Sequence, residues 1–253
     1  MDHLKLLLDL HGRADRQGPG SDEDTKLALR LSGLKAHKNL TIADIGCGTG
    51  ASTLVLAEEL DASIKAVDLF PEFLERLTVR AETKGVRSRI QTIATSMEDL
   101  PFEPESLDAV WSEGAIYNIG FETGVKAWRS FLKPGGVLAV SELTWLTATR
   151  PQELNDHWAS EYPHVATASE KIAQIEGVGY TLLGYFPLAP SSWLDTYYRP
   201  LQARFDVFLT KHKNARDAQS IVAGERREIG LYERFSSYVS YGFYIAQKLP
   251  DRA

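Results

Sequence analysis

The sequence predicts an α/β fold in which helices cover both faces of a mostly parallel sheet. Short apolar runs alternate with segments of helical composition over residues 41–143, as strands and their crossover helices do in a parallel sheet. The first of these runs ends in three closely spaced glycines and leads directly into a helix. With 253 residues, of which 43% are hydrophobic and 25% charged, the chain is long enough to bury a large core.

The elements of this sheet follow from the apolar runs and the turn residues between them. The predicted strands are 41–45, 63–68, 90–94, 107–111, 137–143, 180–186 and 239–247. The predicted helices beside them are 51–60, 71–84, 121–131 and a mostly helical stretch, 151–176. Pro71 is well placed in a first helical turn, and Gly85 follows the last turn of the same helix.

A helical segment is also predicted at the N-terminus, over residues 1–33. A Leu-rich run that Lys5 and Asp9 interrupt predicts a short amphipathic helix rather than a signal peptide. Ser21 supplies an N-cap, and acidic residues follow it in the first turn of a helix that ends near Leu31.

The last two predicted strands are separated by about 50 residues, too many for a hairpin loop. Apolar residues recur there at helical spacing, namely Leu201, Phe205, Phe208 and Leu209, then Ile221, Val222, Ile229 and Tyr232. We therefore expect a helical cap over residues 188–237, inserted between the last two strands and placed on the edge of the sheet. No linker or repeat interrupts the pattern, which predicts a single domain over residues 1–253.

Composition and charge exclude several classes of protein. A net charge of -6 provides no general excess of positive charge for nucleic acid or an anionic membrane surface. No apolar stretch approaches the roughly 20 residues of a membrane span. A single cysteine, Cys47, excludes an intrachain disulfide framework and fits a reducing cytoplasm. The six histidines show no metal-ligand spacing, so we expect no metal. From the charge, the apolar runs and the single cysteine we expect no nucleic acid and no membrane partner, and a cytoplasmic location.

The glycine-rich turn is the most informative stretch, with the sequence Asp44-Ile45-Gly46-Cys47-Gly48-Thr49-Gly50. Glycine lacks a Cβ and permits positive φ, so the backbone can approach a ligand, and the amides of the helix start favour negative groups. The spacing Gly46-x-Gly48-x-x-Ala51 also fits a dinucleotide-binding turn, or a tight turn without a ligand. Asp68 is the last residue of the next predicted strand. It would bind a ribose whether the ligand is a dinucleotide or another nucleoside cofactor, or it would only cap the helix that begins at Pro71. These residues alone leave the ligand open.

Further motifs accompany this turn. They are Val67-Asp68 with Pro71, Met97-Glu98-Asp99-Leu100-Pro101-Phe102, and Phe131-Leu132-Lys133-Pro134-Gly135-Gly136 before a strand. Together with the turn, and over about residues 35 to 145, they resemble class I S-adenosylmethionine-dependent methyltransferases. The chain is most similar to the small-molecule enzymes of the ubiquinone and menaquinone biosynthesis type (type 11). More loosely, Arg16-Gln17-Gly18-Pro19-Gly20, the stretch from Ser112 to Asn118 and the C-terminal third resemble an uncharacterised bacterial subgroup.

The resemblance implies a seven-stranded Rossmann-like sheet with an antiparallel last strand, and a site for S-adenosylmethionine without a metal. The implied cofactor-binding residues are Asp44, Gly46, Cys47, Gly48, Gly50, Asp68, Leu69, Ser96, Met97, Glu98 and Ser112. The glycines would surround the methionine part of the cofactor, and Asp68 would bind the ribose. The residues from Ser96 to Glu98 would lie beside the adenine, and Ser112 and Glu113 would face the sulfonium. Ser96 stands where many relatives carry an Asp, so its hydroxyl or Glu98 would take over that adenine contact.

The implied reaction is an in-line displacement at a methyl group that the sulfonium already activates, so alignment and exclusion of water matter most. If the acceptor needs a base, Glu113 is the first candidate, with Tyr117 and Asn118 as orienting donors. The alternative to these catalytic roles is that Glu113 accepts hydrogen bonds from backbone amides and Tyr117 packs in the core. The stretch from Arg16 to Gly20 is either a hinged lid over the cofactor or an ordinary loop.

The function expected from the resemblance is methyl transfer to a small organic acceptor, with S-adenosylhomocysteine as the product. Aromatic and arginine residues of the cap either suit a flat or amphipathic acceptor with an acidic group or simply pack the cap. They are Trp193, Tyr197, Tyr198, Phe205, Phe208, Tyr232, Arg199, Arg204, Arg226 and Arg227. A cofactor-binding regulatory subunit without turnover and an NAD-dependent oxidoreductase remain as alternatives, and the oligomeric state stays unknown.

Overall fold

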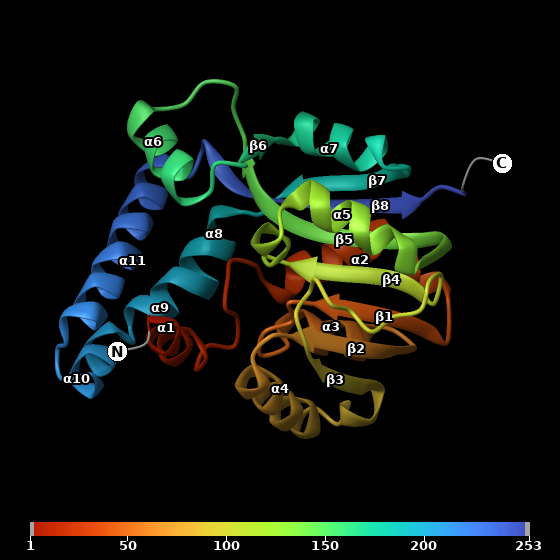
Figure 1. Cartoon of the computed structure of the whole chain (residues 1–253), viewed down its shortest axis with the longest axis horizontal. Coiled ribbons are helices and arrows are strands. Elements are labelled where there is room, and N and C mark those ends of the chain that lie inside the picture. The colour runs from red at the N-terminus through yellow and green to blue at the C-terminus, as the bar shows by residue number, and fades with distance from the viewer. Residues whose placement is uncertain (1–2, 251–253) are drawn as a thin grey trace.

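The computed structural model describes residues 3–250 and has one sheet at its centre (Figure 1). Its strands are β1 (Leu40–Ile45), β2 (Ala62–Asp68), β3 (Ile90–Ala94), β4 (Leu107–Glu113), β5 (Leu132–Trp145), β6 (Ala166–Thr167), β7 (Tyr180–Pro187) and β8 (Val239–Lys248). The strand order is β3-β2-β1-β4-β5-β8-β7, and β6 pairs with β5 off this path. β3, β2, β1, β4 and β5 pair in parallel, whereas β8 is antiparallel to β5 and to β7. The expected sheet is confirmed, and β6 is a two-residue strand that the sequence did not reveal.

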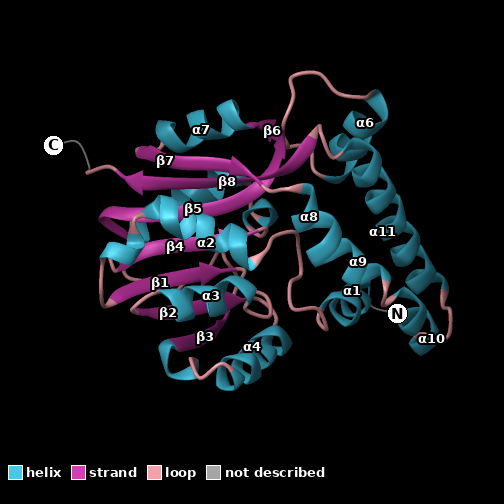
Figure 2. Ribbon diagram, turned by 180° about the vertical axis from the view of Figure 1, so that it is seen from behind, coloured by secondary structure: helices cyan, strands magenta, loops and turns pink. Residues whose placement is uncertain are grey.

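Helices cover both faces of this sheet. The α-helices of the described residues, including those of the cap, are α1 (His3–His11), α2 (Asp22–Ser32), α3 (Ala51–Glu59), α4 (Pro71–Thr83), α5 (Phe121–Trp128), α6 (Gln152–Glu161), α7 (Ala168–Gly177), α8 (Pro190–Trp193), α9 (Arg199–Gln202), α10 (Phe205–Lys211) and α11 (Arg216–Phe235). α5 lies in front of the sheet in Figure 1, α7 packs into the same core through Ile175, and Figure 2 shows α2 and α3 on the opposite face. Within residues 3–250, no helix has both the length and the apolar character that a membrane crossing requires.

The sheet separates two apolar cores. On β1, Ile42 packs into the core that α2 and α3 share, and the next residue, Ala43, packs into the core on the α5 side. Successive strand side chains point to opposite faces, so a strand covered on both sides needs apolar residues at every position. This is why the strands could be recognised as short continuous apolar runs.

Helix boundaries follow local sequence signals, with two corrections. The Ser21 side chain accepts a hydrogen bond from the amide of Asp24, as its N-cap position predicted. The predicted helix 121–131 ends as an α-helix at Trp128 and continues as a 3₁₀ turn over Arg129–Phe131. The predicted stretch 151–176 is two helices, because α7 begins anew at a capping box formed by Thr167 and Glu170.

The cap is helical, as predicted, but it does not lie on the edge of the sheet. Figures 1 and 2 show α8 to α11 beyond the carboxyl ends of the parallel strands. β7 pairs antiparallel to β8 and therefore runs in the same direction as β5, so the chain leaves β7 at that end and returns there as β8. The buried aromatic residues of the cap continue the core on the α2 and α3 side, and α1 joins them through Leu6 and Leu10.

Candidate functional site

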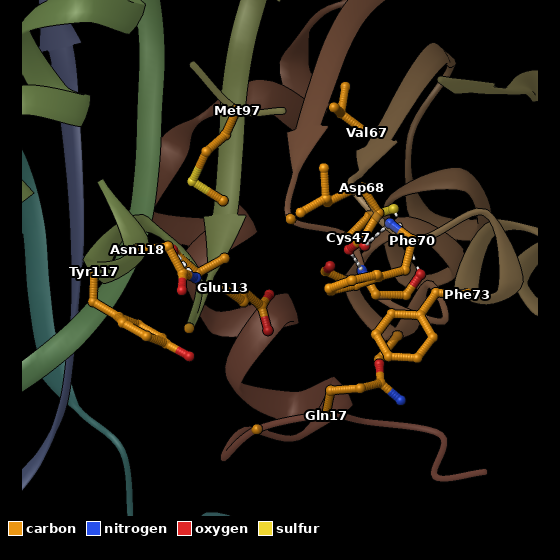
Figure 3. A pocket seen from close by; sticks show the side chains of 18 of the residues that line it. Gln17, Cys47, Val67, Asp68, Phe70, Phe73, Met97, Glu113, Tyr117 and Asn118 are labelled. Atoms are coloured by element: carbon orange, nitrogen blue, oxygen red, sulfur yellow. Dashed lines mark hydrogen bonds between the residues drawn. The ribbon is translucent and has the colours of Figure 1, made fainter. Parts of the chain in front are cut away.

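A cavity of about 420 Å³ opens at the carboxyl ends of β1, β2 and β4. The predicted site residues that line it are Gly46, Cys47, Gly48, Asp68, Leu69, Ser96, Met97, Glu98, Glu113, Tyr117 and Asn118. Its size falls within the range of small-molecule sites. In Figure 3, Asp68 and Cys47 lie on one side of Glu113, and Tyr117 and Asn118 lie on the other. Residues from several parts of the chain thus meet in one concave site.

The glycine-rich turn depends on its glycines for conformation and for space. Gly46, Gly48 and Gly50 have φ values of 72°, 56° and 86°, in the left-handed region that side chains disfavour. A Cβ on Gly46 would lie 2.3 Å from the Cβ of Ala115, and one on Gly50 would lie 2.1 Å from Cδ1 of Leu77. The absence of a side chain at Gly50 therefore lets α4 pack against the turn, whereas Gly46 and Gly48 line the cavity itself.

Asp44 and Ser112 are buried beside the turn and do not line the cavity. The Asp44 carboxylate accepts hydrogen bonds from the hydroxyls of Ser52 at 2.8 Å and Thr53 at 2.6 Å, which fastens the start of α3 to β1. Burial raises the pKa of Asp44 to about 7, against the opposing effect of these two hydroxyls. Ser112 donates to the carbonyl of Ile45 at 2.8 Å. Both residues support the turn from behind.

Asp68 presents its carboxylate to the cavity from the end of β2. The amide of Gly48 donates to Oδ2 at 2.8 Å and the amide of Phe70 donates to Oδ1 at 3.0 Å. Burial raises the pKa of Asp68, and hydrogen bonds from the backbone oppose that rise. A carboxylate oxygen accepts more than one hydrogen bond, so both oxygens retain capacity for hydroxyl groups of a ligand.

Apolar and polar side chains form the next part of the wall. Met97 lines the cavity, and its carbonyl accepts a hydrogen bond from the Trp128 indole at 3.4 Å. The Ser96 hydroxyl accepts a hydrogen bond from the amide of Glu98 at 3.2 Å, which shapes the turn after β3. The Phe70 and Phe73 rings, 5.5 Å apart, flank the opposite side. The wall suits a flat, largely apolar ring with polar edges.

Glu113 is held by three side-chain donors. Arg16 Nη1 donates to Oε2 at 2.9 Å, while the Thr25 hydroxyl at 2.7 Å and the Trp111 indole at 2.9 Å donate to Oε1. The alternative that Glu113 binds backbone amides is not what the structure shows. The Glu113 side chain is 8% exposed and the Arg16 side chain 10%, so this is a largely buried ion pair.

The segment before α2 forms one side of the cavity, with Arg16, Gln17, Gly18 and Pro19 in its lining. The Gln17 side chain accepts from the amide of Thr49 at 2.9 Å and donates to the carbonyl of Ala14 at 3.0 Å. The segment is therefore pinned to the glycine-rich turn. The sequence singled out this stretch as a lid or a loop, but it did not indicate that Arg16 pairs with Glu113.

Tyr117 borders the cavity and is 42% exposed, so it does not fill the core. Its ring meets that of Tyr162 with the centroids 6.0 Å apart, and the Tyr162 hydroxyl donates to Glu142 at 3.3 Å. Burial raises the pKa of Glu142 to about 7, and the positive charge of Lys171 opposes this rise. Glu142 and Tyr162 were not predicted, because nothing in the local sequence places them beside Tyr117.

The aromatic residues of the cap mostly pack against each other and the sheet. Trp193 and Tyr232 stack with their centroids 4.5 Å apart, and both are buried. Arg199, Arg226 and Arg227 are exposed to solvent. Most of these residues therefore pack the cap, which was the simpler of the two interpretations. Among the residues described, no grouping of three His, Cys, Asp or Glu side chains is arranged to hold a metal ion.

Comparison with known proteins shows what this part of the chain is similar to. Residues 42–136 match the family model described as a methyltransferase domain. Erythromycin 3''-O-methyltransferase of Saccharopolyspora erythraea is 36% identical over 112 residues, which are 44% of this chain and 37% of that protein. In three curated relatives, the match with this chain covers 37%, 51% and 42% of the relative's length. The chain therefore spans about half of these relatives or less.

Solved structures share the fold over nearly the whole chain. A methyltransferase of Geobacter sulfurreducens, solved with S-adenosyl-L-homocysteine, superimposes with a TM-score of 0.82 at 17% identity, covering 96% of this chain and 98% of that one. The cyclase SpnF superimposes with a TM-score of 0.74 at 19% identity, covering 97% and 92%. The fold is therefore shared with proteins named for different reactions. Residues 42–136 thus match a methyltransferase domain, and the chain shares its fold with methyltransferases that were solved with S-adenosyl-L-homocysteine.

Proposed function

We propose that the protein is an enzyme that transfers the methyl group of S-adenosylmethionine to a small organic acceptor and releases S-adenosylhomocysteine. The observation that carries this proposal is the hydrogen bond of 2.8 Å from the amide of Gly48 to Asp68. It joins the glycine-rich turn to an acidic strand end in one cavity, where a nucleoside and an amino acid can be bound side by side. The Geobacter sulfurreducens neighbour, solved with S-adenosyl-L-homocysteine, supports the choice of ligand.

The residues that line the cavity fit this cofactor. Asp68 would accept hydrogen bonds from the ribose hydroxyls, and Met97 would pack against the adenine with Ser96 or Glu98 near its polar edge. Arg16 also lines the cavity, where its guanidinium group is already paired with Glu113 and Asp22. A Cβ at Gly46 would overlap Ala115 and one at Gly48 would overlap Gln17, so glycine at these positions keeps the turn packed against the other walls of the cavity.

When bound, the cofactor supplies a methyl group that its sulfonium activates for in-line displacement. The protein then has to align the acceptor and exclude water. Since Asp68 occupies one side of Glu113 and Tyr117 the other, the acceptor would bind on the Tyr117 side (Figure 3). Tyr117 and Asn118 would orient it there. Relatives named for O-methylation of erythromycin and 24-C-methylation of sterols support an organic acceptor.

Glu113 takes a different role in this proposal from that of a general base. Its carboxylate already accepts from Arg16, Thr25 and Trp111, so it holds the N-terminal segment against the cavity. Closing that segment over the cofactor would exclude water from the methyl group. The net charge of -6 supports a small-molecule acceptor rather than nucleic acid.

The proposed function is tested by ligand binding and by turnover. S-adenosylhomocysteine should raise the melting temperature of the purified protein, because a ligand that binds the native state stabilises it by mass action. NADH at the same concentration should have no effect. Incubation with methyl-labelled S-adenosylmethionine and a panel of small alcohols, phenols, amines and acids should then label at least one of them. Binding without label transfer to any of the panel would instead favour a cofactor-binding subunit.

A further inference from the structure

A second cavity, of about 630 Å³, lies on the outer side of the N-terminal segment. It is open to solvent and is lined by the segment between α1 and α2, by helix α4 and by the cap residues around α9. Five arginines line it, namely Arg13, Arg16, Arg76, Arg80 and Arg204. They come from three separate parts of the chain, so the fold gathers them. Such a concentration of guanidinium groups is unexpected in a protein of net charge -6.

Two carboxylates in the lining only partly balance these charges. Asp15 lies 3.1 Å from Arg76 Nη2 and 3.8 Å from Arg80 Nε. Asp22 lies 3.2 Å from Arg16 Nη2, and Arg16 is also paired with Glu113 on its other side. Five guanidinium groups are therefore opposed by three carboxylates, Asp15, Asp22 and Glu113, and the local charge is positive.

Two of the arginines also have donors without an acceptor. Nε of Arg76 and Nε of Arg204 are buried, and neither forms a hydrogen bond with any residue that the structure describes. Burial lowers the pKa of Arg204, and the nearby charge of Arg76 lowers it further. A buried donor without a partner is costly, and two neighbouring cations add repulsion. An anion between them would satisfy both.

We propose that this second cavity binds a phosphoryl group, carried by a small phosphorylated metabolite or present as free phosphate. A guanidinium group offers parallel N–H donors that match phosphate oxygens in a bidentate arrangement, and it remains charged when buried. A dianion also fits the surplus positive charge better than a single carboxylate does. Ser21 and Thr196 also line the cavity, but their hydroxyls already donate to Asp24 and to the carbonyls of Gly20 and Ser192, so the arginines are the donors that the site offers.

Occupation of the second cavity should also affect the cofactor. Arg16 and Ala51 line both cavities, so the N-terminal segment is the wall between them. A phosphoryl group bound to Arg76, Arg80 and Arg204 would hold this wall in place from outside. By linkage, phosphate and cofactor then strengthen each other's binding equally. This coupling rests on the proposed function, whereas phosphate binding itself does not.

The test is a titration of the full-length protein without cofactor. Inorganic phosphate and glycerol 3-phosphate are compared with sodium chloride at matched ionic strength, by calorimetry and thermal unfolding. Stabilisation by either phosphate beyond that of chloride is expected. Tighter binding of the ester would assign the site to a phosphorylated metabolite, and equal binding would assign it to free phosphate. If neither inorganic phosphate nor glycerol 3-phosphate stabilises the protein more than sodium chloride does, the proposal is overturned.

Variants locate the site. R204Q and R76Q should each weaken phosphate binding by about tenfold, the effect of one charge-assisted contact. R227Q, which removes an exposed arginine of α11 outside this cavity, should bind phosphate like the wild type. R13Q, at an exposed lining position, provides a further variant that burial does not complicate. Equal phosphate affinity in the wild type, R204Q, R76Q and R13Q would place the bound anion elsewhere and refute the assignment.

Adding S-adenosylhomocysteine separates this proposal from the proposed function. If S-adenosylhomocysteine fails to bind while phosphate still binds at these arginines, the proposed function is wrong and the phosphate site is retained. If both bind, each should lower the apparent Kd of the other by the same factor in the wild type, and less in R204Q. Independent binding of the two ligands would refute the coupling.

Discussion

The Arg16 guanidinium donates to the Glu113 carboxylate over 2.9 Å, although the two residues are 97 positions apart in the sequence. This contact joins the segment before α2 to the end of β4 beside the candidate cofactor cavity. Burial lowers the pKa of Arg16, but the charges and hydrogen bonds of Glu113 and Asp22 together outweigh this effect, and the net pKa is raised. The ion pair therefore fixes a wall of the cavity.

The first prediction concerns this ion pair. E113Q should reduce the free energy of unfolding by about 3 kcal/mol, because it removes the buried partner of the Arg16 charge and leaves only the exposed carboxylate of Asp22. It should also weaken S-adenosylhomocysteine binding, since the wall is loosened. Urea denaturation and calorimetry measure the two effects. A variant with unchanged stability and cofactor affinity but no turnover would instead return Glu113 to the role of a general base.

The second prediction concerns the ribose contact. D68A should weaken S-adenosylhomocysteine binding by about tenfold or more, because a charge-assisted hydrogen bond contributes 1.5 kcal/mol or more and about 1.4 kcal/mol corresponds to tenfold. D68N, which retains an acceptor oxygen, should have an intermediate effect. Titration calorimetry on folded protein measures both. Equal affinity in the wild type and D68A would contradict the assignment of Asp68.

The third prediction separates backbone strain from steric overlap in the glycine-rich turn. Gly33 and Gly46 both have φ of 72°, but a Cβ on Gly33 would meet nothing within 4 Å, whereas one on Gly46 would overlap Ala115. G33A should therefore cost about 1 kcal/mol in unfolding free energy, and G46A at least about 3 kcal/mol. Chemical denaturation of both variants checks the difference. Similar costs would mean that the turn can shift away from Ala115.

The fourth prediction is a dependence of stability on pH. Burial raises the pKa of Glu228 from 4.5 to about 7, although the Tyr198 hydroxyl donates to it at 2.8 Å. A carboxyl group whose pKa is higher in the folded state stabilises the fold below its ordinary pKa, and that contribution is lost as the pH rises to about 7. E228Q keeps the acceptor for Tyr198 but does not ionise.

Relative to the wild type, E228Q should therefore gain stability between pH 5 and pH 8, by up to about 3 kcal/mol. The neighbouring charges on Glu225, His11 and Glu161 are the same in both proteins and largely cancel in this comparison. Unfolding free energies measured across this pH range give the difference directly. A difference that stays constant with pH would show that Glu228 titrates normally.

Local patterns in the sequence predicted the elements and the part of the site that these elements present directly. Gly46 and Gly48 follow β1 and Asp68 ends β2, two strands that their apolar runs reveal, and parallel strands end at the same edge of a sheet. Contacts between distant segments could not be predicted in this way. The pairing of Arg16 with Glu113 and the donation from Tyr162 to Glu142 depend on where α2 and the chain after α6 come to lie.

The cap illustrates the same limit. Its helical spacing was visible, but its position beyond the strand ends depends on the direction of β7, which pairing with β8 determines. The arginines of the second cavity are also scattered in the sequence, with Arg204 in the cap and Arg76 on α4. Only the folded chain reveals that their charges converge.

The central claim is that the cavity at the carboxyl ends of β1, β2 and β4 holds S-adenosylmethionine. Isothermal titration calorimetry of the wild-type protein with S-adenosylhomocysteine and, separately, with NADH tests it most directly. We predict saturable binding of one S-adenosylhomocysteine per chain and no heat from NADH. Binding of NADH with no response to S-adenosylhomocysteine would contradict the account.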